Sequence, residues 1–95
     1  MRTKKEFEEL IYRCAKELNK QLSEESRIAL EESTAIFGEN SALDSLGIVM
    51  LMVSVEEHIA EDMGFSINIV DVITEADAPP FVTIGDMCFW LLEQS

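Results

Sequence analysis

The sequence contains no lysine or arginine after Arg27. All seven basic side chains lie within residues 1–27, whereas residues 28–95 carry thirteen acidic residues. The net charge of −12 therefore comes from +1 in the first segment and −13 in the second. A negative field of this kind repels phosphate backbones and anionic lipid, and it attracts basic protein surfaces. The charge argues against nucleic-acid binding and predicts partners with basic surfaces, with simple solubility as the alternative explanation.

Long apolar runs are also missing. No run approaches the roughly 20 residues that a membrane-spanning helix needs. The N-terminal residues 1–9 include acids where a signal peptide requires an apolar stretch. With 95 residues and a hydrophobic content of 47%, the chain is long enough to bury a modest core. We therefore expect a single domain over residues 1–95 that is cytoplasmic, monomeric and not inserted into a membrane.

The sequence has two cysteines, Cys14 and Cys88. Each falls on the apolar stripe of an expected helix. We interpret them as reduced thiols in the core of a cytosolic protein, because free cysteine is among the most often buried residue types. A disulfide between the first and last helices is the alternative.

Residues for self-contained catalysis are scarce. The single histidine, His58, would have to bind a metal together with Glu61 and Asp62, and this group is more typical of a solvated helix face. There is no glycine-rich phosphate loop and no calcium-binding loop. Ser45 and His58 are roughly 20 Å apart along one helix at 1.5 Å per residue, so Ser45 has no nearby base. We therefore expect neither an enzyme nor a metal protein.

The spacing of apolar residues predicts four helices. The first spans about residues 4–19 after a capping box at Thr3-Lys4-Lys5-Glu6. The second runs from Asp44 or Ser45 to about residue 62. Residues 65–69 alternate like an extended segment. A short third helix covers about residues 70–76 before two prolines, and Thr83 caps the last helix.

The second helix is apolar on two faces. One stripe comprises Ile48, Leu51, Met52, Val55 and Ile59, and the other comprises Leu46, Val49, Met50 and Val53. A chain of 95 residues cannot surround such a helix completely. One stripe is therefore expected in the core and the other on a binding surface, or both line a cavity. A small bundle that buries both stripes is the alternative.

The connection over residues 20–43 is unusually long for a compact domain, so we expect it to have a purpose. Residues 24–30 are compatible with a helical turn that directs Ile28 and Leu30 inward. Ile36 and Phe37 are expected to anchor the loop to the core before a turn at residues 37–40. The loop then leads directly to Asp44 and Ser45.

Several motifs surround Ser45. In isolation, an Asp or Ser at a helix start is an ordinary N-cap. Here the motifs are Leu43-Asp44-Ser45-Leu46-Gly47-Ile48-Val49, then Met50-Leu51-Met52-Val53-Ser54-Val55-Glu56-Glu57, and later Thr83-Ile84-Gly85-Asp86. With the long first loop and the short third helix, they resemble the acyl carrier protein family, small four-helix proteins that bear 4′-phosphopantetheine on a serine. The turn at residues 37–40 and the stretch Pro79-Pro80-Phe81 are most similar to small free-standing carriers.

The resemblance implies an all-α four-helix bundle with a short third helix and a long first loop. It implies that a phosphopantetheinyl transferase uses coenzyme A to attach 4′-phosphopantetheine to Ser45, with Asp44 supporting the modification. A phosphodiester at a helix N-terminus would meet unpaired backbone N–H groups and the positive end of the helix dipole. The arm would carry acyl groups as thioesters and present them to partner enzymes at high local concentration.

The resemblance also implies a docking face on the second helix. Its members are Leu46, Val49, Met50, Val53, Glu56 and Glu57. Familiar carriers have acids in the first two turns after the serine, but this helix has none before Glu56. We therefore expect apolar docking, with charge supplied by Glu39, Glu56, Glu57 and the third helix, and a dedicated pathway such as a specialised lipid, a polyketide-like product or acyl modification of a glycan.

An acyl cleft is a further expectation. The core should contain Ile48, Leu51, Val55, Ile59, Ile67, Ile73, Ile84 and Leu91. If Ile48, Leu51, Val55, Ile59, Ile73 and Ile84 part, they would form an apolar cleft that shelters an acyl chain. Methionines such as Met52 and Met63 suit a core that repacks around different contents.

Two alternatives remain open. An unmodified acidic adaptor would use the apolar second helix to bind a basic protein, with Ser45 only as a helix cap worth about 1 kcal/mol. An aminoacyl or peptidyl carrier would bear the same arm with different cargo, although the acidic charge favours acyl cargo.

Overall fold

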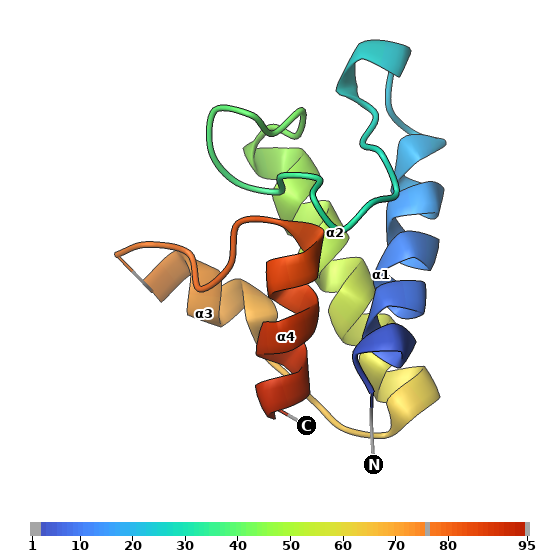
Figure 1. The fold of residues 1–95 in the computed structure, drawn as a ribbon, viewed down its shortest axis with the longest axis vertical. Coiled ribbons are helices and arrows are strands. Elements are labelled where there is room, and N and C mark those ends of the chain that lie inside the picture. The colour runs from blue at the N-terminus through green and yellow to red at the C-terminus, as the bar shows by residue number, and fades with distance from the viewer. Residues whose placement is uncertain (1–2, 76, 95) are drawn as a thin grey trace.

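The computed structural model describes residues 3–75 and 77–94. The helices in this part of the chain are α1 (Lys4–Asn19), η1 (Glu24–Ser26), α2 (Ser45–His58), η2 (Ile59–Met63), α3 (Ile69–Glu75) and α4 (Ile84–Gln94). The described residues form no strand, and one isolated bridge joins Ala35 to Thr83. The predicted all-α class is therefore confirmed (Figure 1).

The helix ends follow from local signals in the sequence. The Thr3 side chain accepts a hydrogen bond from the Glu6 N–H and caps α1, as predicted. The segment η2 continues α2 as one π-helical turn, which the sequence did not predict. It ends at Gly64, whose φ of 76° is a left-handed conformation that suits glycine. Residues 65–68 connect η2 to α3 without regular structure.

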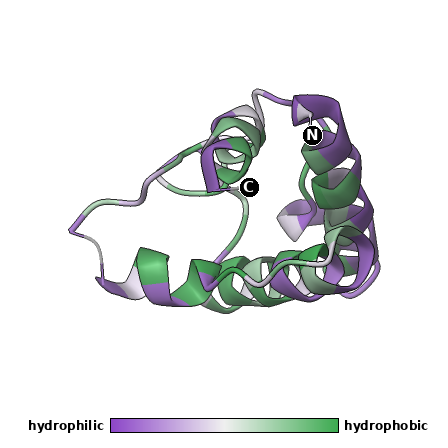
Figure 2. Ribbon diagram, turned by 90° about the horizontal axis from the view of Figure 1, so that it is seen from below, coloured by the Kyte–Doolittle hydropathy of each residue, from purple (hydrophilic) through white to green (hydrophobic). Residues whose placement is uncertain are grey.

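The helices enclose one apolar core. Helix α1 packs against α2 and α4, and α2 packs against α3. Figure 2 shows that hydrophobic residues occupy much of α2 and α3. Of the expected core residues, Ile48, Ile67 and Ile73 are half-buried against the core. The others are fully buried, and these are Leu51, Val55, Ile59, Ile84 and Leu91.

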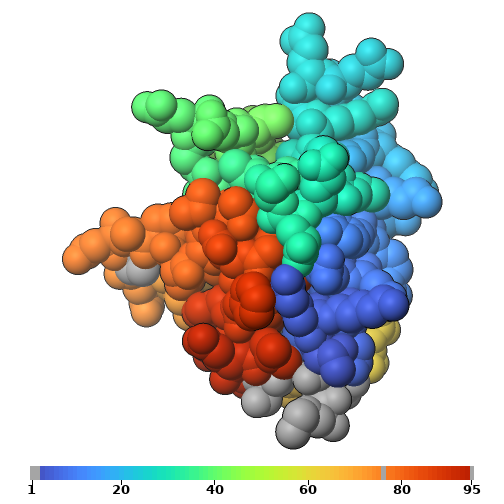
Figure 3. All heavy atoms as spheres, in the orientation of Figure 1, coloured from blue at the N-terminus to red at the C-terminus, as the bar shows by residue number. Residues whose placement is uncertain are grey.

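The first loop is held by hydrogen bonds near its start and in its middle. The Asn19 side chain closes two hydrogen bonds of 2.9 Å with the backbone N–H and C=O of Ile28, which turns Ile28 into the core. Further on, the loop binds the start of α4 through Ile84 N–H to Thr34 O (3.0 Å) and Gly85 N–H to Glu32 O (2.9 Å). Figure 3 shows loop residues packed beside α1 and α4.

The loop also corrects one expectation. Ile28 and Ile36 are buried, as predicted, but Leu30 is 42% exposed. The chain bends at Leu30 because the Thr34 hydroxyl donates to the carbonyl of Ala29 at 2.8 Å. This bend directs Leu30 outward, whereas a helical turn continuing to Leu30 would have buried it.

Both cysteines lie in the core. Cys14 and Cys88 are fully buried and, within the described residues, neither forms a disulfide, which agrees with the interpretation as reduced thiols. Burial raises the pKa of the Cys14 thiol and raises that of Cys88 to about 12. The two thiols are therefore protonated and shielded near neutral pH.

Candidate functional site

The candidate site is the start of α2. Asp44 has an extended backbone (φ −86°, ψ −179°), and its Oδ1 accepts a hydrogen bond from the Gly47 N–H at 2.7 Å. Its carbonyl accepts the first helical bond from the Ile48 N–H at 2.9 Å. Asp44 is thus the N-cap and Ser45 is the first helical residue. The cap function that the adaptor alternative assigned to Ser45 belongs to Asp44.

The Ser45 side chain is exposed. No described residue forms a hydrogen bond with its hydroxyl. In the same part of the chain, the backbone N–H groups of Ser45 and Leu46 have no partner either. Unpaired N–H groups at a helix N-terminus favour an anionic group, as does the positive end of the helix dipole. The site therefore combines an accessible hydroxyl with donors suited to a phosphate ester.

The single histidine of the chain is distant from Ser45. His58 lies at the other end of α2, and its Nδ1 is 2.8 Å from the carbonyl oxygen of Ser54. Asp62, expected beside His58 on a solvated face, pairs with Arg13 at 3.2 Å. Residues 3–75 and 77–94 contain no group of three or more His, Cys, Asp or Glu side chains placed to hold a metal.

The first half of α2 exposes apolar side chains. Leu46 is 68% exposed, and Val49 and Val53 are 37% and 41% exposed. Met50, from the same expected stripe, is half-buried against the core. Exposed apolar side chains that cluster mark recognition surfaces more often than scattered ones do. Leu46, Val49 and Val53, which recur at helical spacing, form what we call the α2 apolar face.

The two acids expected on this face have different surroundings. Glu57 is exposed. Glu56 is half-buried, and its Oε2 accepts a hydrogen bond from the Val70 N–H at 3.3 Å. This contact is at the start of α3, where a negative charge interacts favourably with the positive end of the helix dipole. Glu56 therefore has a structural contact that the sequence did not predict.

The residues expected to line an acyl cleft are closely packed. Leu51, Val55, Ile59 and Ile84 have no exposed surface, whereas Ile48 and Ile73 are half-buried. A cavity of about 470 Å³ lies in the first loop, where residues between Arg27 and Ala42 face Val82 and Thr83. None of the six expected cleft residues lines it. Sequence spacing could not reveal this cavity, because hydrogen bonds between distant segments form it.

A smaller cavity of about 60 Å³ lies beside the site. Its lining comprises Leu22, Ser26, Ala42, Leu43 and Asp44. The segment after α1, the η1 turn and the residues before α2 therefore meet at one end of the molecule (Figure 1). The early part of the first loop thus lies beside the residues that precede Ser45.

Comparison with protein-family models, with curated proteins and with solved structures finds no match to this chain. No helix among the described residues has both the length and the apolar character needed to cross a membrane. A function for the site must therefore be argued from its residues and their surroundings.

Proposed function

We propose that the chain is an acyl carrier protein that bears 4′-phosphopantetheine on Ser45. The observation that carries the proposal is the separation of roles at the start of α2. Asp44 caps the helix, and this leaves the Ser45 hydroxyl exposed and unbonded among the described residues. The Leu43-Asp44-Ser45-Leu46 motif and the order of the helices support the same conclusion, with the carrier-type four-helix bundle as its fold.

The residues at the site fit the group. The N–H groups of Ser45 and Leu46, unpaired within the described chain, would hold the phosphate ester together with the positive end of α2. The Asp44 carboxylate is occupied by the Gly47 N–H and orients the first turn. When bound, the group supplies a thiol that carries acyl chains as thioesters. The chain itself would hold and present the arm, and its partner enzymes would perform the reactions.

The α2 apolar face would dock these partners. Leu46, Val49 and Val53 lie within the first three turns after Ser45, so a partner that covers them also reaches the arm. The net charge of −12 would steer enzymes with basic surfaces toward the carrier. Because the face is apolar where familiar carriers are acidic, we assign the protein to a dedicated lipid, secondary-metabolite or acyl-modification pathway.

The test is the intact mass of the protein after incubation with coenzyme A and a broad-specificity phosphopantetheinyl transferase. We expect the wild type to gain one phosphopantetheine and Ser45→Ala to gain none. Ser66→Ala, which changes an exposed serine outside the helices, is the matched control and should be modified fully. Circular dichroism of each variant would show that it is folded.

Other outcomes have distinct meanings. If folded wild type gains no mass with either the broad-specificity or a cognate transferase, the carrier proposal is wrong and the acidic adaptor is favoured. If it is modified but accepts only aminoacyl groups from partner enzymes, the protein is an aminoacyl or peptidyl carrier. Full replacement of a housekeeping carrier in reconstituted fatty acid synthesis would contradict the dedicated pathway.

A further inference from the structure

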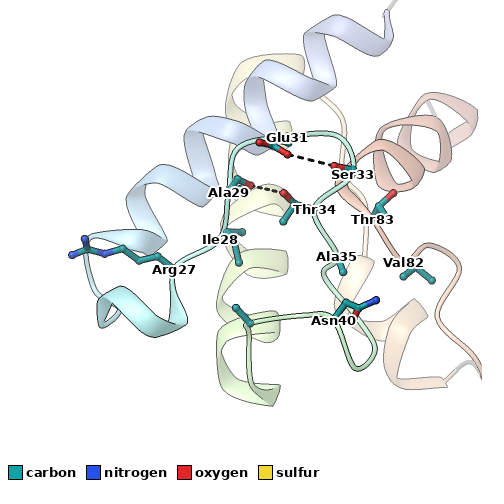
Figure 4. Close-up of a pocket in the computed structure, with 11 residues that line it drawn as sticks. Arg27, Ile28, Ala29, Glu31, Ser33, Thr34, Ala35, Asn40, Val82 and Thr83 are labelled. Carbon is teal, nitrogen blue, oxygen red and sulfur yellow. Dashed lines mark hydrogen bonds between the residues drawn. The ribbon is translucent and has the colours of Figure 1, made fainter.

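The first-loop cavity has the size of a binding site. Its volume of about 470 Å³ falls within the roughly 300–1,000 Å³ of small-molecule pockets. Figure 4 shows Ile28, Thr34, Ala35 and Asn40 around one opening, with Val82 and Thr83 on the opposite side. These side chains come from the long connection before Ser45 and from the segment before α4.

The walls of this cavity are held by hydrogen bonds. The Thr34 hydroxyl donates to the carbonyl of Ala29 at 2.8 Å, and the Thr34 carbonyl accepts from the Ile84 N–H at 3.0 Å. The bridge between Ala35 and Thr83 joins the two sides. Ala29, Ala35 and Ala42 also line the space, and their small side chains leave it open. The cavity is therefore formed before any ligand binds.

The lining of the cavity offers hydrogen-bonding groups to an amide-bearing chain. The Asn40 side-chain amide has no partner among the described residues, so it can both donate and accept a hydrogen bond. The Thr83 oxygen accepts from the Asp86 N–H at 3.1 Å, which leaves its O–H able to donate. The Arg27 side chain extends away from the opening, and its Nε donates to the Asn19 carbonyl at 3.0 Å (Figure 4). The rest of the lining mixes aliphatic residues with the polar side chains of Glu31, Ser33 and Thr34. The Ser33 hydroxyl donates to the Glu31 carboxylate at 3.4 Å (Figure 4).

The cavity begins close to Ser45. Ala42 stands three residues before Ser45, so their Cα atoms are at most about 11 Å apart in a fully extended chain. The core offers less room, because Leu51, Val55, Ile59 and Ile84 have no exposed surface. An arm attached to Ser45 thus meets an open cavity on the loop side and a closed core along α2.

We propose that the first-loop cavity binds the pantetheine part of the arm on Ser45, an inference that rests on the proposed function. Asn40 and Thr83 provide hydrogen bonds for its amides. Ala29, Ala35, Ala42 and Val82 contact its methyl and methylene groups. The long first loop then has a purpose, since it shelters the unloaded arm between encounters with partner enzymes.

The experiment compares backbone amide NMR spectra of the apo protein and the fully modified protein. Intact mass must first show complete modification, because failure at that stage contradicts the carrier function and not the choice of cavity. In the modified protein, we expect shift changes at Thr34, Asn40, Val82 and Thr83 as well as at the start of α2. Contacts between the geminal methyl groups of the arm and the Val82 methyls should appear in nuclear Overhauser spectra.

A pair of variants makes the assignment specific. Ala29→Leu adds volume at an exposed cavity wall far from Ser45 in sequence, and Ala60→Leu makes the same change at an exposed position of η2. Ala29→Leu should be modified fully yet lose the shift changes at Thr34 and Thr83, whereas Ala60→Leu should keep them. Changes confined to the start of α2 or spread over α2 and α3 in the modified wild type would overturn the proposal. Unchanged loop shifts in Ala29→Leu would do the same.

Discussion

The Gly47 N–H donates to Asp44 Oδ1 at 2.7 Å, and a Cβ at Gly47 would lie only 3.2 Å from that same oxygen. It would also lie 3.3 Å from Leu43 Cδ2. The absence of a side chain at Gly47 thus lets the Asp44 carboxylate fold over the first turn while Leu43 stays in the core. This arrangement gives the cap to Asp44 and leaves Ser45 available.

The stability of the helix start should depend on Asp44 and not on Ser45. Asp44→Ala should lower the free energy of unfolding by about 1 kcal/mol, the usual value of an N-cap. Ser45→Ala should change it by much less, because no described residue bonds its hydroxyl and alanine favours helix. Urea titrations of the two variants would measure this, with Asp44→Asn as a control that keeps an acceptor. Equal losses in Asp44→Ala and Ser45→Ala would contradict the assignment of the cap.

The conformation of the first loop near Ile28 should be stabilised by the Asn19 side chain. This side chain makes two 2.9 Å hydrogen bonds with the backbone of Ile28. Asn19→Ala leaves both backbone groups without that partner, so we expect a loss of about 1–3 kcal/mol in the free energy of unfolding. Amide exchange at Ile28 should accelerate by more than exchange in α1. Asn68→Ala, at an exposed position, is the control. If Asn68→Ala and Asn19→Ala lower the free energy of unfolding equally, the two hydrogen bonds of Asn19 contribute little.

Local patterns were sufficient to predict much of the fold. The capping Thr3, the apolar spacing of α1 and α2 and the stop at Gly64 act within a few residues, so the sequence reveals them directly. The π turn of η2 was not predicted, because a single i→i+5 turn within a longer helix is too short to change the apolar pattern recognisably. The outward position of Leu30 was also missed, since it depends on the Thr34–Ala29 hydrogen bond.

Some features of the candidate site were also predictable from the sequence, and others were not. Asp44 and Ser45 were predictable because capping is a property of neighbouring residues. The contact from Glu56 to Val70 and the cavity between Thr34 and Thr83 were not, because each joins segments that are distant in sequence. Periodicity identified the apolar stripes of α2, but tertiary packing decided that Met50 turns toward the core while Val49 and Val53 remain exposed.

Glu56 should stabilise the short helix α3. A helix of seven residues is marginal on its own, and the Glu56 carboxylate accepts the Val70 N–H at its start. Glu56→Ala removes this acceptor and the favourable charge at the helix start, so the amides of α3 should exchange faster with solvent. Glu57→Ala removes an exposed acid of the same type from the next position and should leave α3 unchanged. If both variants accelerate exchange equally, net charge and not the specific contact stabilises α3.

The folded protein should lose stability as the pH rises above about 9. Burial raises the pKa of Cys14, raises that of Cys88 from 9.0 to about 12, and raises that of Tyr12 from 10.0 to about 12, with help from its hydrogen bond to Glu8. In the unfolded chain these groups ionise at their ordinary pKa values, so above them the unfolded state releases protons that the folded state retains. The stabilisation is therefore complete below the ordinary values and is lost as the pH approaches the folded ones. The measurement is the free energy of unfolding in urea from about pH 8 to about pH 11.

The double variant Cys14→Ala, Cys88→Ala is the control. It should be less stable throughout because its core is smaller, but its stability should fall less steeply with pH. A wild-type curve that stays flat or rises over this range would show that the thiols do not resist ionisation in the folded protein.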